Sequence, residues 1–207
     1  MNFVFEQQPW DGLLDGIKES ETVSALQLLT VCEQADEEEM ELFLDSLAEK
    51  HIEIDLTTLP KVPGADGSAV RLQQEEKMVR QGTLLQGLEE NDPLRLYLEE
   101  VAAITETEPP KQLETTEQRR RFTDAMLIRV VQLAQEYVGM GVLLLDLIQE
   151  ANLGLWQGVQ TCTDGDAVDH CLWWSRHYLC RAVLLQAKAA GVGQKLRQAM
   201  EDYRTVD

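Results

Sequence analysis

The chain has 207 residues, 37 acidic against 18 basic side chains, and a net charge of −19, a balance that argues against generic nucleic-acid binding, which needs a basic surface. No apolar run reaches the roughly 18 to 20 residues of a membrane span, and the N-terminus lacks a signal-peptide pattern, so we expect a cytoplasmic protein. Glycine-rich phosphate loops, metalloprotease motifs and nucleophile elbows are absent from the sequence, so we expect no enzyme, no cofactor and no small-molecule substrate.

The negative charge is concentrated toward the N-terminus: residues 1–90 hold 20 acidic and 6 basic side chains, whereas residues 91–207 hold 17 and 12. Residues 22–51 predict two short helices, the second with carboxylates at its N-terminus, where the helix dipole favours them. Residues 52–56 alternate like a short strand, and PKVPGADGS then breaks the periodicity. We predict a small acidic helical domain at 1–60 and a linker with some helical content at 61–90.

A larger helical domain is predicted over residues 91–207. Its first helix begins at Asp92 and Pro93, which supply an N-cap and a first-turn proline. A second helix is expected from about Thr115, and its three arginines form either a solvated face or a phosphate contact. Further helices are expected at 142–159, 168–190 and 194–203. Because the long periodic segments all have three-four spacing, the fold class is all-α.

The segment VLLLDLIQEANLGLWQGV, residues 142–159, predicts a helix with two different faces. Asp146, Gln149 and Leu153 share one face, which is either solvated or built to meet a partner. The opposite, core-facing side is predicted to consist of apolar residues at three-four spacing: Leu144, Leu147, Ile148, Ala151, Leu155 and Val159.

The string LDLIQEANLGLW in this helix resembles LDLIQEGNIGLM, typical of region 2.1–2.2 in the sigma-70 family of bacterial RNA polymerase specificity subunits. MLIRVVQLAQEYVGMG at 126–141 is similar to the family's preceding helix, Trp173-Trp174 with Arg176 is similar to its WWIRQ, and DPLRLYLEEV at 92–101 resembles the DPVRMYLREM of region 1.2. The acidic domain at 1–60 resembles region 1.1 in pattern.

The resemblance implies a partner, core RNA polymerase, because in the family this helix docks on the clamp helices of the largest subunit. The RNA polymerase-binding residues it implies are Asp146, Gln149, Glu150, Asn152 and Leu153.

A DNA-facing surface is predicted on the helix after residue 168. Trp174, His177, Arg181 and Lys188 fall on one face, and an aromatic ring interleaved with cations suits base stacking and phosphate neutralisation; alternatively, Trp174 covers the core and the cations are only solvated. In the family the corresponding positions approach the promoter −10 element. The DNA-binding candidates are Trp173, Trp174, Arg176, His177, Arg181 and Lys188.

The segment TCTDGDAVDHCL, residues 161–172, departs from the family's KFDYRRGYKFSTYAT. It has no aromatic ring, and Asp164, Asp166 and Asp169 stand where cations are expected. Since unstacking a base costs a few kcal/mol and stacking it on a ring returns about 1–3 kcal/mol, we expect a degenerate −10 contact surface. The chain ends at Asp207, so we expect the family's −35-reading and exit-channel regions to be absent.

Two main functions and one variant remain open. The first is a divergent sigma-70-like transcription initiation protein that binds core RNA polymerase and contacts promoter DNA weakly at most. The alternative is a regulator or decoy that occupies the clamp site without promoter melting, its acidic front mimicking nucleic acid. The variant is a two-chain sigma factor whose missing regions come from another protein.

The four cysteines predict no metal site. Cys32, Cys162, Cys171 and Cys180 form no CxxC pair, and a zinc site that combined the last two with His170 and His177 would have a spacing unlike the known structural classes. We expect buried or inert thiols in a reducing compartment.

Overall fold

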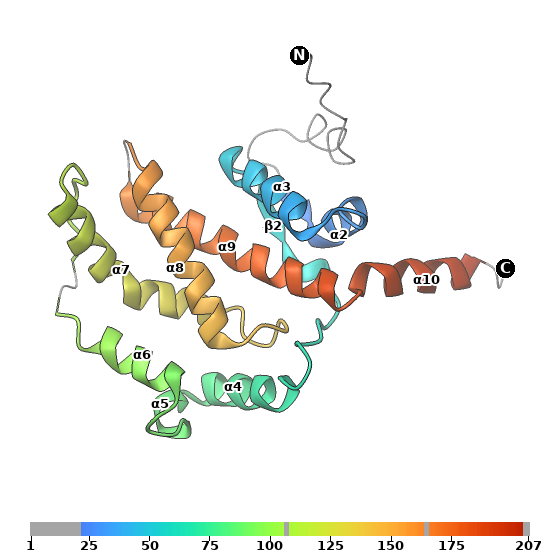
Figure 1. The fold of residues 1–207 in the computed structure, drawn as a ribbon, viewed down its shortest axis with the longest axis horizontal. Coiled ribbons are helices and arrows are strands. Elements are labelled where there is room, and N and C mark those ends of the chain that lie inside the picture. Colours follow the sequence, from blue (N-terminus) through green and yellow to red (C-terminus); the bar gives the residue numbers. More distant parts are fainter. Residues whose placement is uncertain (1–21, 106–107, 164–165, 205–207) are drawn as a thin grey trace, which may run out of the picture. The chain divides into compact units, whose positions relative to one another are not determined.

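The computed structural model describes residues 22–105, 108–163 and 166–204, and their regular structure is almost entirely helical (Figure 1). The all-α prediction is therefore confirmed. The chain divides into two compact units, one formed by Met1–Pro60 with Ala187–Asp207 and the other by Lys61–Gln186. None of the described helices combines the length and the apolar character that a membrane crossing requires.

The first unit contains a small parallel sheet and short helices. Strand β1 (Thr22–Ser24) pairs with β2 (Glu53–Asp55), with Val23 opposite Ile54. The elements between them are α2 (Ala25–Val31) and α3 (Glu37–Glu49); η1 (Leu56–Thr58) follows β2, and α10 (Val192–Arg204) packs against α2. The core of this unit includes Leu28, Met40, Phe43, Leu44, Leu47 and Ile52.

The carboxylates predicted at the start of the second helix cap it. The Glu39 amide donates to Asp36 Oδ1 at 2.8 Å, and the Asp36 amide donates to Glu39 Oε2 at 2.9 Å, which forms a reciprocal capping box. Strand β1 differs from the prediction, which assigned residue 22 onward to a helix. Three residues are too few to show an alternating pattern, and their pairing partner lies about thirty residues away.

The second unit is a helical domain. It contains α4 (Ala69–Gln81), α5 (Leu84–Gly87), α6 (Pro93–Ala102), α7 (Thr116–Gln135), α8 (Leu144–Thr161) and residues 167–186 of α9 (Ala167–Ala189). Helices α7 and α8 pack along each other, and α6 contacts both. The six residues predicted to form the core-facing side of α8 are all buried, which confirms that face.

The two compact units have bounds other than those of the predicted domains at two segments. Residues 61–90, predicted to be a linker with some helical content, contain α4 and α5 and lie in the compact unit Lys61–Gln186. Residues 187–204, predicted to belong to the larger domain, are part of the first unit.

Two glycines let α9 approach α8 closely. A Cβ atom at Gly154 would lie 2.6 Å from the Ser175 Cα and 2.6 Å from the Trp174 carbonyl oxygen, and one at Gly158 would lie 2.7 Å from the Cys171 Cα. These contacts are with backbone, which cannot move aside as a flexible side chain can. The two helices can therefore pack at this distance only because both positions lack side chains.

Gly154→Ala should therefore destabilise the helical unit. Overpacking typically costs about 1–3 kcal/mol, and alanine recovers up to about 1 kcal/mol through its higher helix propensity. We expect a net loss of about 1–2 kcal/mol in chemical denaturation. Gly193→Ala in α10, in the first unit, is the control for a helical glycine with room for a methyl group, because its Cβ would meet its nearest atoms at 3.5 Å or more. Equal stability of Gly154→Ala and wild type would contradict the close-packing argument.

Candidate functional site

The exposed side of α8 carries Asp146, Gln149, Leu153 and Trp156, and we call these four residues the α8 outer face. They recur at three-four spacing opposite the buried side of the helix. Leu153 is 49% exposed and Trp156 is 60% exposed. Two large apolar side chains left in solvent beside a carboxylate and an amide are typical of a surface that meets another macromolecule.

Trp156 is absent from the residues predicted to bind polymerase. It lies three residues after Leu153 and ten after Asp146, so continuing the same helical face by one turn would have included it. Its large exposed ring is the strongest apolar feature of the α8 outer face.

Glu150 and Asn152 lie at the two edges of that face and bond within the protein. Glu150 accepts a hydrogen bond from Arg181 Nη2 of α9 at 3.2 Å, and Asn152 Nδ2 donates to the Tyr97 hydroxyl of α6 at 2.8 Å. Burial raises the pKa of Tyr97, with the Asn152 hydrogen bond opposing the shift. These two residues therefore join α8 to its neighbouring helices.

The predicted DNA-facing side of α9 is largely buried. Trp174 is 6% exposed and His177 is 4% exposed, and their rings meet edge-on at 6.4 Å. The Arg181 guanidinium lies 4.1 Å from the centre of the Tyr178 ring, in addition to its pairing with Glu150. The three-four spacing correctly places these residues on one side of α9, but that side faces the protein interior.

Trp173, Arg176 and Lys188 have different surroundings. Arg176 is exposed and Trp173 is partly exposed. The Lys188 ammonium donates to the carbonyl oxygens of Cys32 and Ala35, just beyond the C-terminal end of α2, so it satisfies backbone acceptors within the first unit. Any role for Lys188 in binding DNA would require those hydrogen bonds to break.

The acidic residues of segment 161–172 have a local role. The Asp166 carboxylate accepts from the Val168 amide at 3.0 Å at the start of α9, and Asp169 is exposed in the first turn, where the helix dipole favours negative charge. Asp164 lies outside the described residues. Thr161 Oγ1 and His170 Nε2 are 2.9 Å apart.

Three of the four cysteines, Cys32, Cys171 and Cys180, are buried. Burial raises the pKa of Cys171 to about 12, and that of Cys32 to about 11 with Lys188 opposing the shift. These two thiols are therefore protonated at neutral pH and poor nucleophiles. Within the described part of the chain, no group of three or more histidine, cysteine, aspartate or glutamate side chains could hold a metal ion.

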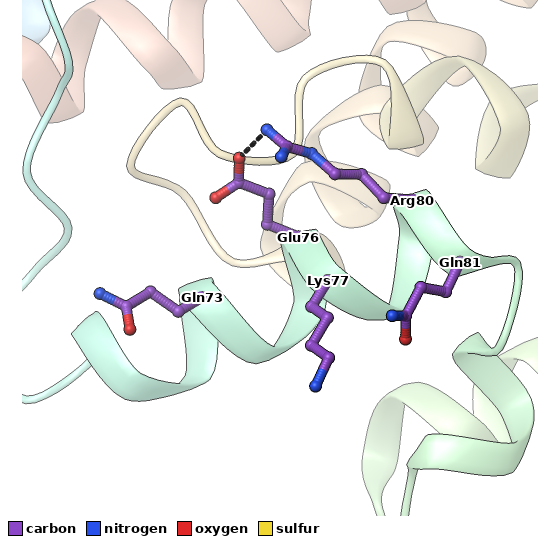
Figure 2. A pocket seen from close by; sticks show the side chains of 5 residues that line it. All are labelled: Gln73, Glu76, Lys77, Arg80 and Gln81. Atoms are coloured by element: carbon purple, nitrogen blue, oxygen red, sulfur yellow. Dashed lines mark hydrogen bonds and ion pairs between the residues drawn. The ribbon is translucent and has the colours of Figure 1, made fainter.

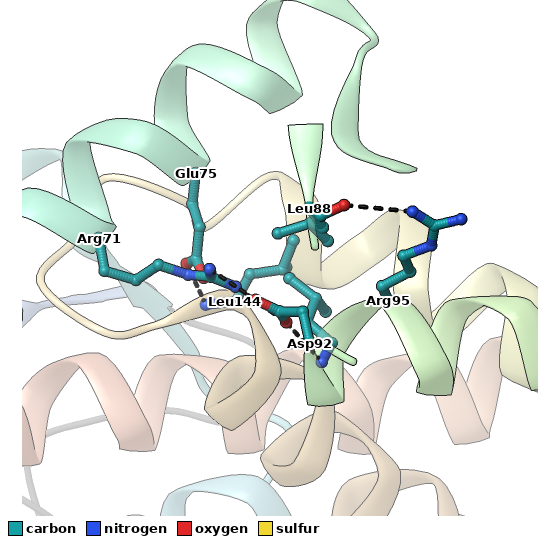
Figure 3. Close-up of polar contacts among 7 residues, drawn as sticks. Arg71, Glu75, Leu88, Asp92, Arg95 and Leu144 are labelled. Carbon is teal, nitrogen blue, oxygen red and sulfur yellow. Dashed lines mark hydrogen bonds and ion pairs between the residues drawn. The ribbon is translucent and has the colours of Figure 1, made fainter. Parts of the chain in front are cut away.

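Helix α8 receives its N-terminal cap from α4 (Figure 3). Its N-cap residue, Leu143, has no side chain that can accept a hydrogen bond, and Glu75 Oε2 accepts from the Leu144 amide at 2.8 Å instead. Glu75 is only 2% exposed, and Arg71 Nε donates to its other oxygen at 2.7 Å. A buried carboxylate is thus held between a helix N-terminus and a guanidinium.

Arg71 also connects this cap to α6. Its Nη1 donates to Asp92 Oδ2 at 2.7 Å (Figure 3). Asp92 Oδ1 accepts from the Leu94 amide at 2.9 Å. Burial alone would raise the pKa of Asp92, but the hydrogen bonds from Arg71 and Leu94 outweigh it and hold that pKa below its ordinary value. Asp92 therefore remains ionised and caps α6, as its place before Pro93 predicts.

The outward side of α4 has a shallow polar depression lined by Gln73, Glu76, Lys77, Arg80 and Gln81 (Figure 2). Glu76 and Arg80 form an i,i+4 ion pair at 2.5 Å, and the Arg80 side chain is 76% exposed. All the lining residues come from one helix, so we interpret the depression as a solvated surface.

The comparisons with known proteins identify the region that contains this site. The model for Sigma-70 region 2 matches residues 123–186, which include α8 and most of α7 and α9. The chain is 30% identical over 164 residues to RNA polymerase sigma factor SigA of Listeria monocytogenes, a match that covers 74% of this chain and 44% of that protein. It is 34% identical over 113 residues to RNA polymerase sigma factor SigA of a Bacillus species, covering 49% of this chain and 30% of that protein.

No solved structure gives a significant match. The chain spans less than half the length of these curated relatives. Nevertheless, the matched region contains the α8 outer face, and the Listeria match extends over most of the chain. The chain is a divergent member of the sigma-70 family.

Proposed function

We propose that this protein is a divergent sigma-70-like transcription initiation protein that binds core RNA polymerase through the α8 outer face. The docking site is the pair of clamp helices in the largest subunit. The observation that carries the proposal is the exposed pair Leu153 and Trp156, flanked by Asp146 and Gln149. An apolar centre with a polar rim is the usual construction of a protein–protein interface.

The five residues that the resemblance implied have different roles in this proposal. Asp146, Gln149 and Leu153 meet the polymerase directly, together with Trp156. Glu150 and Asn152 act at the edges, where their bonds to Arg181 and Tyr97 fix the orientation of α8. The protein binds rather than catalyses, and it works in the bacterial cytoplasm, where its partner is found.

The DNA surface in this proposal is small. Trp173 and Arg176 are its accessible members, since Trp174, His177 and Arg181 lie largely inside the protein. The exposed carboxylates Asp166 and Asp169 would repel a phosphate backbone nearby. The same observation favours the second candidate function, a regulator that occupies the clamp site without promoter melting.

The proposal predicts that Leu153→Asp weakens binding to core RNA polymerase. A charge placed at the centre of an apolar contact should cost about 2 kcal/mol or more of binding free energy, which raises the dissociation constant roughly thirtyfold. Binding can be measured by fluorescence anisotropy of the labelled chain titrated with purified core enzyme. Because Leu153 is exposed, the thermal melt of the variant should match that of wild type.

Val70→Asp is the matched control, since Val70 is a 78% exposed apolar residue on α4 and not a member of the α8 outer face. It should bind core enzyme as wild type does. Wild-type affinity of Leu153→Asp would show that this face of α8 is not the docking surface.

A further inference from the structure

We infer that Glu75 and Arg71 are positioning residues for polymerase binding: from α4, they set the start of α8 and thereby the α8 outer face. The inference rests on the proposed function. Neither residue contacts that face itself, so both act through the helix that carries it. In the sequence, both residues fall in a segment predicted to be a linker with some helical content.

The first step is the missing local cap. The first turn of an α-helix has amide groups without intrahelical acceptors, and a side chain at the N-cap position usually satisfies one of them. Leu143 cannot do so, although its backbone has the extended conformation of an N-cap residue, with φ −67° and ψ 146°. Glu75, 69 positions before Leu144, supplies the acceptor for the Leu144 amide.

The second step is charge. The Glu75 carboxylate is buried, and a buried carboxylate is costly unless it is paired. It sits at the positive end of the α8 dipole, and Arg71 donates to it from the preceding turn of α4. Figure 3 shows Glu75 reaching from α4 to the Leu144 amide, with Arg71 beside it. The cap is therefore held in place by an ion pair and has little freedom to swing away.

The third step connects the cap to the other edge of the face. Arg71 also pairs with Asp92, the N-cap of α6, and α6 carries the Tyr97 hydroxyl that accepts from Asn152. One guanidinium thus joins the start of α8 to the helix that holds its Asn152 edge. Asp146 lies in the first turn of α8, two residues after the capped Leu144 amide, so its position depends most on this cap.

The test compares Glu75→Ala with Glu76→Ala, which removes the adjacent, partly exposed carboxylate that pairs with Arg80 and does not cap α8. Two quantities are measured in the full chain: hydrogen exchange of the Leu144 and Leu147 amides by NMR, and the dissociation constant for core RNA polymerase. Losing a cap shifts the folding equilibrium of the first turn about fivefold. We expect exchange at both amides to become at least fivefold faster in Glu75→Ala, and binding to weaken by up to the same factor. Glu76→Ala should change neither.

A second-site variant separates positioning from general stability. Leu143→Ser places a capping hydroxyl at the N-cap position itself. Combined with Glu75→Ala, it should restore slow exchange at Leu147 and most of the binding. Glu75→Gln retains an oxygen acceptor for the Leu144 amide, so it should keep both properties within about threefold of wild type. This variant decides the matter if Glu75→Ala does not fold.

Three results would overturn the inference. They are wild-type exchange and binding in Glu75→Ala, lost binding that Leu143→Ser fails to restore, and a folded Glu75→Gln that loses both properties. Failure of the proposed function gives a different result, since wild type itself would not bind core polymerase, while the exchange measurements would still report on the cap.

Discussion

Arg71→Met should lower the free energy of unfolding of the helical unit by about 3 kcal/mol, because removing one partner of a buried ion pair leaves the other charge uncompensated. Glu75 is 2% exposed, and Arg71 is its ion-pair partner. We place the loss at the lower end of the roughly 3–5 kcal/mol range because the Arg71 side chain is 31% exposed and water can partly replace it. The change also removes the bond to Asp92, which weakens the cap of α6.

The loss of unfolding free energy in Arg71→Met can be measured by urea denaturation followed by circular dichroism. A control variant and a double variant test its cause. Arg80→Met removes an exposed i,i+4 pair on the same helix and should cost less than about 1 kcal/mol. In Arg71→Met/Glu75→Gln the uncompensated charge is gone, so the double variant should be more stable than Arg71→Met alone. Additive losses in this cycle would mean that Arg71 and Glu75 do not act as a pair.

The parts of the fold that the sequence predicted are those whose cause is local. The buried side of α8 follows from three-four spacing within a single helix, and all six predicted residues are buried. The caps of α3 and α6 follow from Asp36 and from Asp92 before Pro93, because a capping side chain acts within three residues of its own position.

The parts that the sequence did not predict depend on partners far away in the chain. Strand β1 exists because β2 pairs with it, and α8 is capped by a residue 69 positions earlier. Glu75 looks like an ordinary solvated carboxylate in the sequence of α4. Glu75 is buried because the folded chain places the start of α8 beside it, a contact that the sequence of α4 does not reveal.

The candidate site shows the same division. Spacing placed Asp146, Gln149 and Leu153 together on α8, and the structure puts them on the exposed side. Spacing also grouped Trp174, His177 and Arg181, but periodicity cannot say which side of a helix faces the interior. That depends on residues elsewhere in the chain: Arg181 pairs with Glu150 of α8, and α9 approaches α8 closely at Gly154 and Gly158.

The buried tryptophan bears directly on promoter opening. An extruded base must be held by an accessible aromatic ring, which returns about 1–3 kcal/mol per base against an unstacking cost of a few kcal/mol. Segment 161–172 has no aromatic residue, and Trp174 is 6% exposed. Trp173, which is only partly exposed, is the remaining ring of the pair, and one ring does not offset several unstacked bases.

We therefore expect that the full chain, mixed with core RNA polymerase and promoter DNA, will produce no permanganate-reactive thymines around the −10 element. A sigma factor that opens the same promoter with the same core enzyme is the positive control, and a binding assay in the same buffer must show that the chain occupies the polymerase. The full chain is needed because α4, which lies before residue 90, caps α8. Any residual contact with duplex DNA through Arg176 should weaken steeply as salt rises, since it depends on phosphate neutralisation. Reactive thymines would show that the protein melts DNA without exposed rings and would eliminate the alternative function, a regulator that does not melt promoters. Bound polymerase without an open bubble would favour that regulator.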